Sequence, residues 1–287
     1  VSTIADATSL ATAEDAAQGI VDIVNENMLG ALRLVSVQQG FDPRDFALVA
    51  FGGAGPLHAN ALGVLTGSWP VIIPPSPGVL CAYGDATTNL RNESARTVIR
   101  QFSETTDDEL KGMLEELAES AKALLDREGV AEKDQVLTYS ADLRYFGQGF
   151  EIPVAVDVSK FDGKGGGLEA LSKAFDAEHQ QLFSFLLDAE YELVTIRATA
   201  NGPRPAVKAP KLPDGGPDSS HAVNGKTEVY VEGKMVEAKT YDRLLLKAGN
   251  VVVGPAIVTE MDSTTLVLKG HEATVHPSGS LLIEPTK

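Results

Sequence analysis

The segment Leu48–Ala59 (LVAFGGAGPLHA) constrains the fold of this chain more than any other stretch. The apolar run Phe46–Phe51 is typical of a buried parallel strand. The run Gly52-Gly53-Ala54-Gly55-Pro56 ends that strand, and a helix is expected from about Leu57 to Leu65. A second short apolar strand is expected at Val71–Ile73. Strand, loop, helix and strand in this order predict an α/β unit with a crossover connection.

The glycines of this loop allow two interpretations. Without a Cβ atom, the backbone adopts positive φ angles easily and a ligand approaches it closely. The start of the helix offers free N–H groups and the positive end of the helix dipole, which suit a phosphate, a ribose edge or an adenine. The pattern is neither a P-loop nor a full dinucleotide fingerprint. Gly52, Gly53, Ala54 and Gly55 therefore either contact a nucleotide or form a tight turn in which glycine serves packing only.

The rest of the chain changes character along its length. A long helix over 13–39, capped by Thr12, precedes the loop, and another helix is expected over 79–90. Helices over 107–128 and 167–186, alternating with strands near 137–145, 150–156 and 191–200, predict an α+β segment. Pro, Gly, Ser and Asp dominate 202–224, which favours a linker or long loop. Short strands at 226–232, 235–240, 251–260, 264–268, 272–276 and 280–284 predict a β-rich end. We therefore divide the chain into 1–97, 98–201, 202–224 and 225–287.

Charge and cysteine content exclude some functions. The 287 residues carry a formal net charge of −16, which disfavours nucleic-acid binding because phosphate backbones are repelled. No apolar run approaches the length of a membrane span and no signal peptide opens the chain. The single cysteine, Cys81, forms no internal disulfide, which fits a cytoplasmic location. The first residue is Val1, so we expect a processed, cleaved or truncated chain.

The loop and several other segments resemble one known family. The sequence FGGAGPLHA, Phe51 to Ala59, resembles a signature of the ATP-dependent (hydantoinase A-type) subunit of hydantoinases, 5-oxoprolinases and related acetone carboxylases. Further segments resemble the same family in the same order: Gly40–Phe46, Pro75–Leu80 with Ala82 and Gly84, Arg144–Gln148, Phe175 with Glu178 and His179, Tyr241–Arg243, Gly254–Ile257 and Asp262–Thr265. Separated motifs in the right order are more specific than one loop, and these span nearly the whole chain.

The resemblance implies a fold and a cofactor. It implies the second lobe of an actin/Hsp70-like (RNase H-like) ATPase fold over 1–97, followed by α+β and β-rich modules. Gly52, Gly53, Ala54 and Gly55 would then line the adenosine of ATP. The family's phosphate-binding loop, which would hold Mg²⁺ and the β- and γ-phosphates, has no counterpart in this sequence. We therefore expect the N-terminal half of the same subunit, and a hydantoinase B-type subunit or domain, as partners.

The resemblance also implies a reaction, the ATP-dependent ring opening of a small cyclic amide. Phosphorylation of a lactam or imide oxygen gives an activated imidate-like phosphate that water opens. Two alternatives remain. An acetone-carboxylase-type subunit would phosphorylate a ketone enolate or bicarbonate, and a non-catalytic scaffold would dock a partner through the β-rich end.

Three side chains are weaker candidates for a direct role. His58, at the start of the helix, either contacts a phosphate or moves a proton, or is satisfied locally by the backbone. Arg144 either clamps an anion or pairs with an acid across a sheet, and Gln148 is a candidate for orienting an amide. The oxygens of Asp262–Thr265 suit either a ligand or a turn. No metal site is predicted, because His179 with Glu178 does not form an H-E-x-x-H motif.

Overall fold

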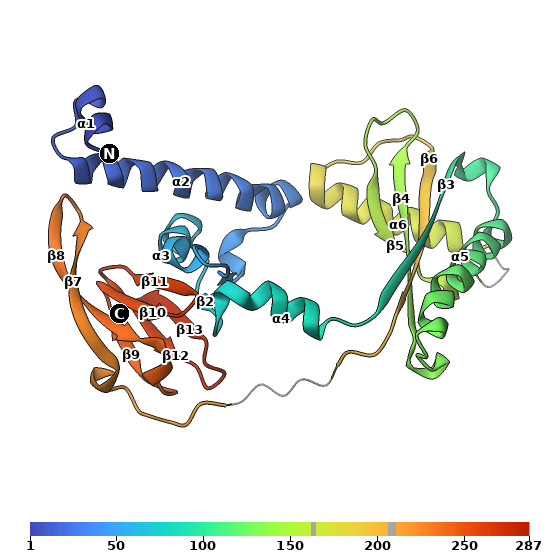
Figure 1. Cartoon of the computed structure of the whole chain (residues 1–287). Helices are drawn as coiled ribbons and strands as arrows, with labels where there is room; N and C mark the ends of the chain where they lie inside the picture. The colour runs from blue at the N-terminus through green and yellow to red at the C-terminus, as the bar shows by residue number, and fades with distance from the viewer. Residues whose placement is uncertain (162–164, 206–210, 287) are drawn as a thin grey trace. The chain divides into compact units, whose positions relative to one another are not determined.

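The computed structural model describes residues 1–161, 165–205 and 211–286, and Figure 1 shows their elements. The chain forms two compact units. The first, which we call the glycine-loop unit, combines Val1–Ala86 with Val207–Lys287. The second, the central unit, is Thr87–Ala206.

A five-stranded sheet in the glycine-loop unit carries the predicted α/β unit. Its order is β1 (Leu48–Val49), β2 (Val71–Ile73), β13 (Leu281–Pro285), β12 (His271–Val275) and β9 (Val251–Val253). β1 pairs with β2 in parallel, and α3 (Gly55–Thr66) connects them. The crossover expected from the sequence is therefore present. β13 runs antiparallel to β2, so the end of the chain lies beside this crossover.

A second, four-stranded sheet completes this unit. Its order is β11 (Ser263–Val267), β10 (Ala256–Glu260), β8 (Lys234–Asp242) and β7 (Val223–Val231). Side chains from both sheets and from α3 share one core that includes Ala59, Ile73, Val258, Val267 and Ile283, each at most 1% exposed. Burial of each large side chain in that core stabilises the fold by about 1.5–3 kcal/mol.

This grouping differs from the division predicted from the sequence. We expected 225–287 to form a β-rich domain separate from 1–97, whereas β13 pairs with β2 and α3 packs against β11. The strand expected over 251–260 is two strands in different sheets, β9 and β10. Gly254 separates them, and a Cβ there would lie 2.0 Å from the Leu268 carbonyl oxygen. Partners so far apart in the chain leave no mark in local periodicity.

The expected linker over 202–224 is only partly described, since 206–210 lie outside the described residues. Its later part packs onto the glycine-loop unit. The Leu212 N–H donates to the Pro277 carbonyl at 2.8 Å, and Asp214 forms a β-bridge with Ala248. Ala222 is fully buried in the shared core. The described residues of this segment therefore form an ordered part of the glycine-loop unit.

Three more helices belong to the first 87 residues. α2 (Ala13–Val35) begins at the predicted cap, where the Thr12 hydroxyl accepts from the Asp15 N–H at 3.0 Å. It buries only Ala16, Asn25 and Leu29. α1 (Ser2–Thr8), which we did not predict, precedes it, and α4 (Leu80–Thr87) follows β2. No helix in the described part of the chain is long and apolar enough to span a bilayer.

The central unit has the α+β organisation that the sequence predicts. Its antiparallel sheet has the order β3 (Arg91–Gln101), β6 (Tyr191–Asn201), β4 (Val136–Tyr145) and β5 (Ile152–Ala155). α5 (Asp107–Arg127) and α6 (Gly167–Phe183) contribute Leu110, Leu114 and Phe175, each fully buried, to its core. At the start of α5, the Thr106 hydroxyl accepts from the Glu109 N–H while the Glu109 carboxylate accepts from the Thr106 N–H. The long strand β3 was not predicted.

Candidate functional site

Two loops meet where the parallel strands β1 and β2 end. Because the strands run in the same direction, their carboxyl ends lie at one edge of the sheet, where α/β proteins bind ligands. Gly52–Gly55 follows β1, and Ser76-Pro77-Gly78 follows β2. The Gly52 N–H donates to the Pro77 carbonyl at 2.7 Å. The predicted glycine loop and the loop after β2 therefore form one continuous edge.

The glycine loop itself is bare backbone. Gly52 has φ of 83°, in the left-handed region that favours glycine, and a Cβ there would contact nothing within 4 Å. Gly53 and Ala54 are exposed. α3 begins at Gly55, two residues earlier than expected, and its N-cap residue Ala54 has no side chain that caps the helix. The loop therefore presents an open main-chain surface next to a helix start, as nucleotide contact requires.

The turn between β10 and β11 packs directly against both loops. Its residue Asp262 lies so close to Gly78 that a Cβ on that glycine would be 2.6 Å from the Asp262 carbonyl oxygen and 2.8 Å from its Oδ2. The Ser263 hydroxyl donates to the Gly53 carbonyl at 3.1 Å. Only glycine at position 78 permits this approach. The turn thus joins the glycine loop to the loop after β2.

A buried ion pair lies behind this turn. Arg243 and Glu260 have side chains only 6% and 7% exposed, and Arg243 Nη1 is 3.3 Å from Glu260 Oε1. The Ser76 N–H donates to Glu260 Oε2 at 3.1 Å. Arg243 Nη2 donates to the carbonyls of Ile73 and Gly279, at 3.0 and 2.8 Å. The pair therefore fixes the end of β2 and the start of the loop that follows it.

Burial dominates the electrostatics of this pair. It lowers the pKa of Arg243, and the carboxylates of Glu260 and Asp262 oppose that shift. It raises the pKa of Glu260, and Arg243 and the Ser76 hydrogen bond oppose that shift. Each partner keeps its charge through the other, so losing either one leaves an uncompensated buried charge.

One carboxylate oxygen in this cluster has no hydrogen-bond partner. Asp262 Oδ2 is buried, and no donor among the described residues reaches it. The sequence predicts Asp262 as a possible ligand and includes Arg243 only in a segment that resembles the family. It does not predict a role for Glu260. A signal for Glu260 was present, because period-two alternation places it on the buried face of β10 with Ala256 and Val258.

His58 lies on α3 and bonds to another helix. Its Nδ1 is 2.8 Å from Oδ1 of Asn25, a residue of α2 that is 5% exposed. This hydrogen bond ties α2 to α3. Of the two interpretations of His58, the contacts favour local satisfaction, here by an asparagine side chain and not by the backbone.

Arg144 and Gln148 lie in the central unit, where their side chains bind other residues of that unit. Arg144 Nε is 2.5 Å from Glu192 Oε2, across the β4–β6 pair, as the ion-pair alternative predicts. Gln148 Oε1 accepts from the Tyr145 N–H at 3.2 Å, and its Nε2 lies 3.2 Å from His179 Nε2. His179 is fully buried, and its Nδ1 bonds the Phe185 carbonyl at 2.9 Å. These contacts fit a structural role for the Arg144–Gln148 motif.

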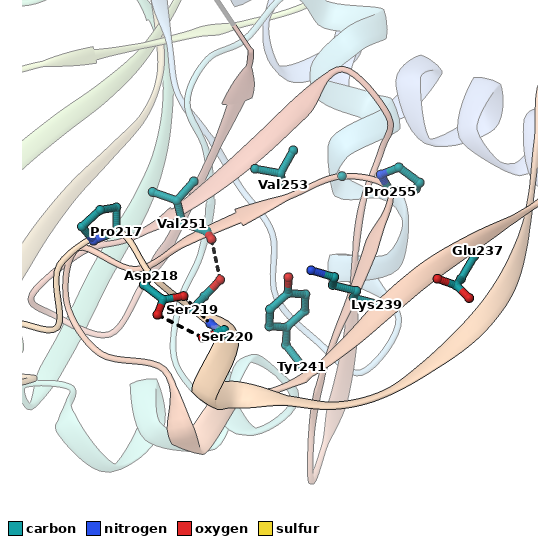
Figure 2. Close-up of a pocket in the computed structure, with 11 residues that line it drawn as sticks. Pro217, Asp218, Ser219, Ser220, Glu237, Lys239, Tyr241, Val251, Val253 and Pro255 are labelled. Carbon is teal, nitrogen blue, oxygen red and sulfur yellow. Dashed lines mark hydrogen bonds between the residues drawn. The ribbon is translucent and has the colours of Figure 1, made fainter.

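The described residues contain no group of three or more His, Cys, Asp or Glu side chains arranged to hold a metal ion. A separate open pocket of about 430 Å³ lies between β8, β9 and the segment before β7 (Figure 2). Lys239 and Tyr241 of β8 line it, opposite Asp218. The Asp218 carboxylate accepts from the Ser220 N–H and hydroxyl. None of the site residues predicted from the sequence lines this pocket.

Comparisons with known proteins agree with the family resemblance and the fold. Residues 1–94 match the hydantoinase/oxoprolinase family model, and residues 99–278 match the hydantoinase/oxoprolinase C-terminal domain. The caprolactamase subunit alpha of Pseudomonas jessenii is 29% identical over 95% of this chain and 40% of its own length. The acetophenone carboxylase gamma subunit of Aromatoleum aromaticum is 31% identical over 88% of this chain and 36% of its own length.

Solved structures show the same fold. The ATP-dependent caprolactamase from Pseudomonas jessenii matches with a TM-score of 0.81 and 26% identity, covering 96% of this chain and 40% of that one. A nucleotide-free acetone carboxylase matches with a TM-score of 0.68 and 23% identity, over 99% of this chain and 41% of that one. The fold is thus of the α/β, ATPase-like class predicted from the sequence. The chain belongs to the hydantoinase/oxoprolinase family, and it spans about two fifths of the length of these relatives.

Proposed function

We propose that this chain supplies the adenosine-binding wall of an ATP-dependent enzyme that phosphorylates the carbonyl oxygen of a cyclic amide and so opens its ring. The observation that carries the proposal is the bare backbone of Gly52–Gly55 at the carboxyl ends of two parallel strands. The family adds support, since relatives include caprolactamase and 5-oxoprolinase.

The chemistry follows from the weakness of an amide as an electrophile. Its carbonyl oxygen attacks the γ-phosphorus of ATP, the bond from that phosphorus to ADP breaks, and an imidate-like phosphate forms. Water then adds to the activated carbon and the ring C–N bond breaks, which leaves an acyl phosphate on the opened chain. A second water hydrolyses that acyl phosphate to the carboxylate and releases phosphate. In such transfers the protein contributes chiefly positioning and charge neutralisation. We assign this chain the positioning of the nucleoside end.

We further propose that the N-terminal half of the subunit holds Mg²⁺ and the β- and γ-phosphates, and that a hydantoinase B-type subunit completes the enzyme. The free edge of β1 supports a partner that packs beside it. β1 lies at the end of its sheet, and Val49, Phe46 and Phe51 beside it are about half exposed. An apolar groove of about 320 Å³ runs along this edge between α2 and α3. Such an apolar edge fits a packing partner.

A second candidate is a carboxylase that phosphorylates a ketone enolate or bicarbonate. Relatives named acetophenone carboxylase gamma subunit and acetone carboxylase beta subunit favour it. The nucleotide wall is the same in both candidates, and only the acceptor of the phosphoryl group differs. Assays of the complete enzyme with ATP and 5-oxoproline, hydantoins, a simple lactam, or acetone with bicarbonate distinguish them. Turnover of a cyclic amide supports the first candidate. Turnover of acetone with bicarbonate, and of none of the cyclic amides, supports the second.

Gly53→Asp tests the nucleotide wall itself. Its Cβ would lie 3.5 Å from the Asp262 carbonyl oxygen, an ordinary contact, so the fold should tolerate it. The added carboxylate would cover the wall and repel ATP. We expect ATP affinity in the complete enzyme to fall by on the order of tenfold or more. Gly149→Asp is the matched control, because Gly149 is exposed with open space around it in the central unit. An unchanged affinity in Gly53→Asp would favour a non-catalytic scaffold instead.

A further inference from the structure

We propose that the β10–β11 turn is part of the nucleotide site and that Asp262 accepts a hydrogen bond from a hydroxyl or amino group of the nucleoside. This inference rests on the proposed function, since it extends the adenosine wall from the glycine loop to a turn about 200 residues later in the chain. The turn comprises Glu260, Met261, Asp262 and Ser263.

The turn is built into the wall from both sides. Ser263 holds the glycine loop through the Gly53 carbonyl, and Glu260 holds the loop after β2 through the Ser76 N–H. Asp262 lies between these two attachments: it contacts Gly78, and its backbone carbonyl oxygen is 3.5 Å from where a Gly53 Cβ would be. A ligand resting on Gly52 and Gly53 therefore lies beside Asp262.

Asp262 lacks the donor that a buried carboxylate oxygen requires. Nearly all buried polar atoms in proteins have a hydrogen-bond partner, because leaving one unpaired costs free energy. Arg243 is the nearby cation, but its Nη1 bonds Glu260 and its Nη2 bonds two carbonyls. Asp262 Oδ2 has no donor in the described part of the chain, so we assign the donor to the ligand.

The donor groups of ATP select the part of the nucleotide that meets Asp262. The triphosphate carries only acceptors and negative charge, and a carboxylate repels it. The donors of ATP are the two ribose hydroxyls and the adenine amino group, all on the nucleoside. A metal ion is a poorer occupant, because the positive Arg243 lies close to Asp262 and no cluster of three ligand side chains surrounds it among the described residues.

The test compares nucleotides that each lack one donor. ATP, 2′-deoxy-ATP, 3′-deoxy-ATP and inosine triphosphate are titrated against the complete enzyme and its Asp262→Ala and Asp262→Asn variants. A hydrogen bond to a charged group corresponds to on the order of a ten- to hundredfold difference in affinity. We expect the unmodified enzyme to prefer ATP over one analogue by that factor, and Asp262→Ala to lose the preference. Which analogue it is identifies the hydroxyl or the amino group.

The controls separate this inference from the nucleotide site as a whole. Asp262→Asn keeps the size of the side chain, so it retains the fold if Asp262→Ala does not, and it should reduce the preference. Asp45→Asn removes an equal charge from an exposed position in the same unit and should change nothing. If both Asp262 variants discriminate among the four nucleotides as the unmodified enzyme does, the role of Asp262 is overturned. If Gly53→Asp also leaves ATP affinity unchanged, the proposed nucleotide wall fails with it.

Discussion

The two units of this chain differ in how completely they satisfy their buried polar groups. In the central unit, Tyr145 and Tyr191 both donate to Asp176, and both nitrogens of His179 have partners. Among the described residues, the glycine-loop unit has three buried side-chain atoms without a hydrogen-bond partner, Asn60 Nδ2, Thr265 Oγ1 and Asp262 Oδ2, whereas the central unit has Gln135 Oε1 alone. The closed networks of the central unit fit a structural role, and Asp262 Oδ2 lies beside the bare backbone of the proposed site.

Two long helices show the same contrast in packing. α5 buries Leu110, Leu114, Leu117, Ala118, Ala121 and Leu125, whereas α2, of similar length, buries Ala16, Asn25 and Leu29. Ile20, Ile23 and Val24 of α2 are exposed although they belong to its apolar side. α5 therefore packs its apolar stripe within its own unit. The exposed apolar residues of α2 remain available to the partner half that we propose.

The variant with the largest expected effect on stability breaks the buried Arg243–Glu260 ion pair of the glycine-loop unit. Arg243→Met leaves Glu260 buried and uncompensated, which should lower the free energy of unfolding by about 3–5 kcal/mol. Adding Glu260→Met should restore most of that stability, because the buried charge is then gone. Urea unfolding monitored by Trp69, the only tryptophan, measures both.

The same variants test whether the pair also positions the loops. The double variant should still bind ATP more weakly, since Glu260 no longer holds the Ser76 N–H. Lys226→Met, which removes an exposed partner of Glu237, should change stability little and serves as the control. Recovery of both stability and ATP affinity in the double variant would show that the pair has no positioning role.

A smaller effect tests the closed network of the central unit. Gln148→Ala leaves His179 Nε2 buried without its donor, and we expect a loss of about 1–3 kcal/mol of stability. Turnover per folded enzyme should not change. Hydrogen exchange of α6 and thermal unfolding measure the first, and steady-state kinetics the second. Gln180→Ala, on an exposed position of the same helix, is the control. A fall in kcat with an intact fold would contradict this prediction and indicate that Gln148 takes part in catalysis.

The pH dependence of the central unit follows from Tyr191. Burial and the hydrogen bond to Asp176 raise the pKa of Tyr191 to about 12, from an ordinary value of 10.0. Because the folded pKa is raised, this tyrosine's contribution to stability is complete below pH 10 and is lost as the pH rises toward 12. Tyr191→Phe should weaken that high-pH loss, leaving the parts due to Tyr145 and Tyr139, whose pKa values burial also raises. Unfolding curves across this range, with tyrosinate absorbance, check it; identical curves for both proteins would contradict it.

The smallest expected effects come from removing the N-terminal caps of α5 and α2. Thr106→Ala removes a capping box from the well-packed α5 and should cost about 1 kcal/mol. Thr12→Ala removes the cap of α2, and here we expect fraying of the first turn, since α2 buries only Ala16, Asn25 and Leu29 along its length. Peptide-resolved hydrogen exchange distinguishes the outcomes. Equal protection at both helix starts would show that α2 is as firmly held as α5.

Local signals in the sequence were sufficient for much of the fold. The Thr12 and Thr106 caps place the starts of α2 and α5, and the apolar run Val71–Ile73 is β2. Local sequence patterns predicted the edge strands β1 and β3 less well. β1 contains only Leu48 and Val49 of the six residues expected, and the charged strand β3 showed no alternation strong enough to predict it. β3 is held by pairing with β6, about 100 residues away.

The sequence by itself determined the glycine loop, because positive φ and bare backbone are properties of the residues at those positions. It also singled out Asp262, but it left two roles for that residue equally open, contact with a ligand or formation of a turn. Tertiary structure alone decided that this aspartate lies against Gly78, and that Arg243 reaches the Ile73 carbonyl 170 residues earlier in the chain. The reason is physical. Pairings between distant strands are selected by the free energy of burying both partners together, and neither partner's own neighbourhood encodes that free energy.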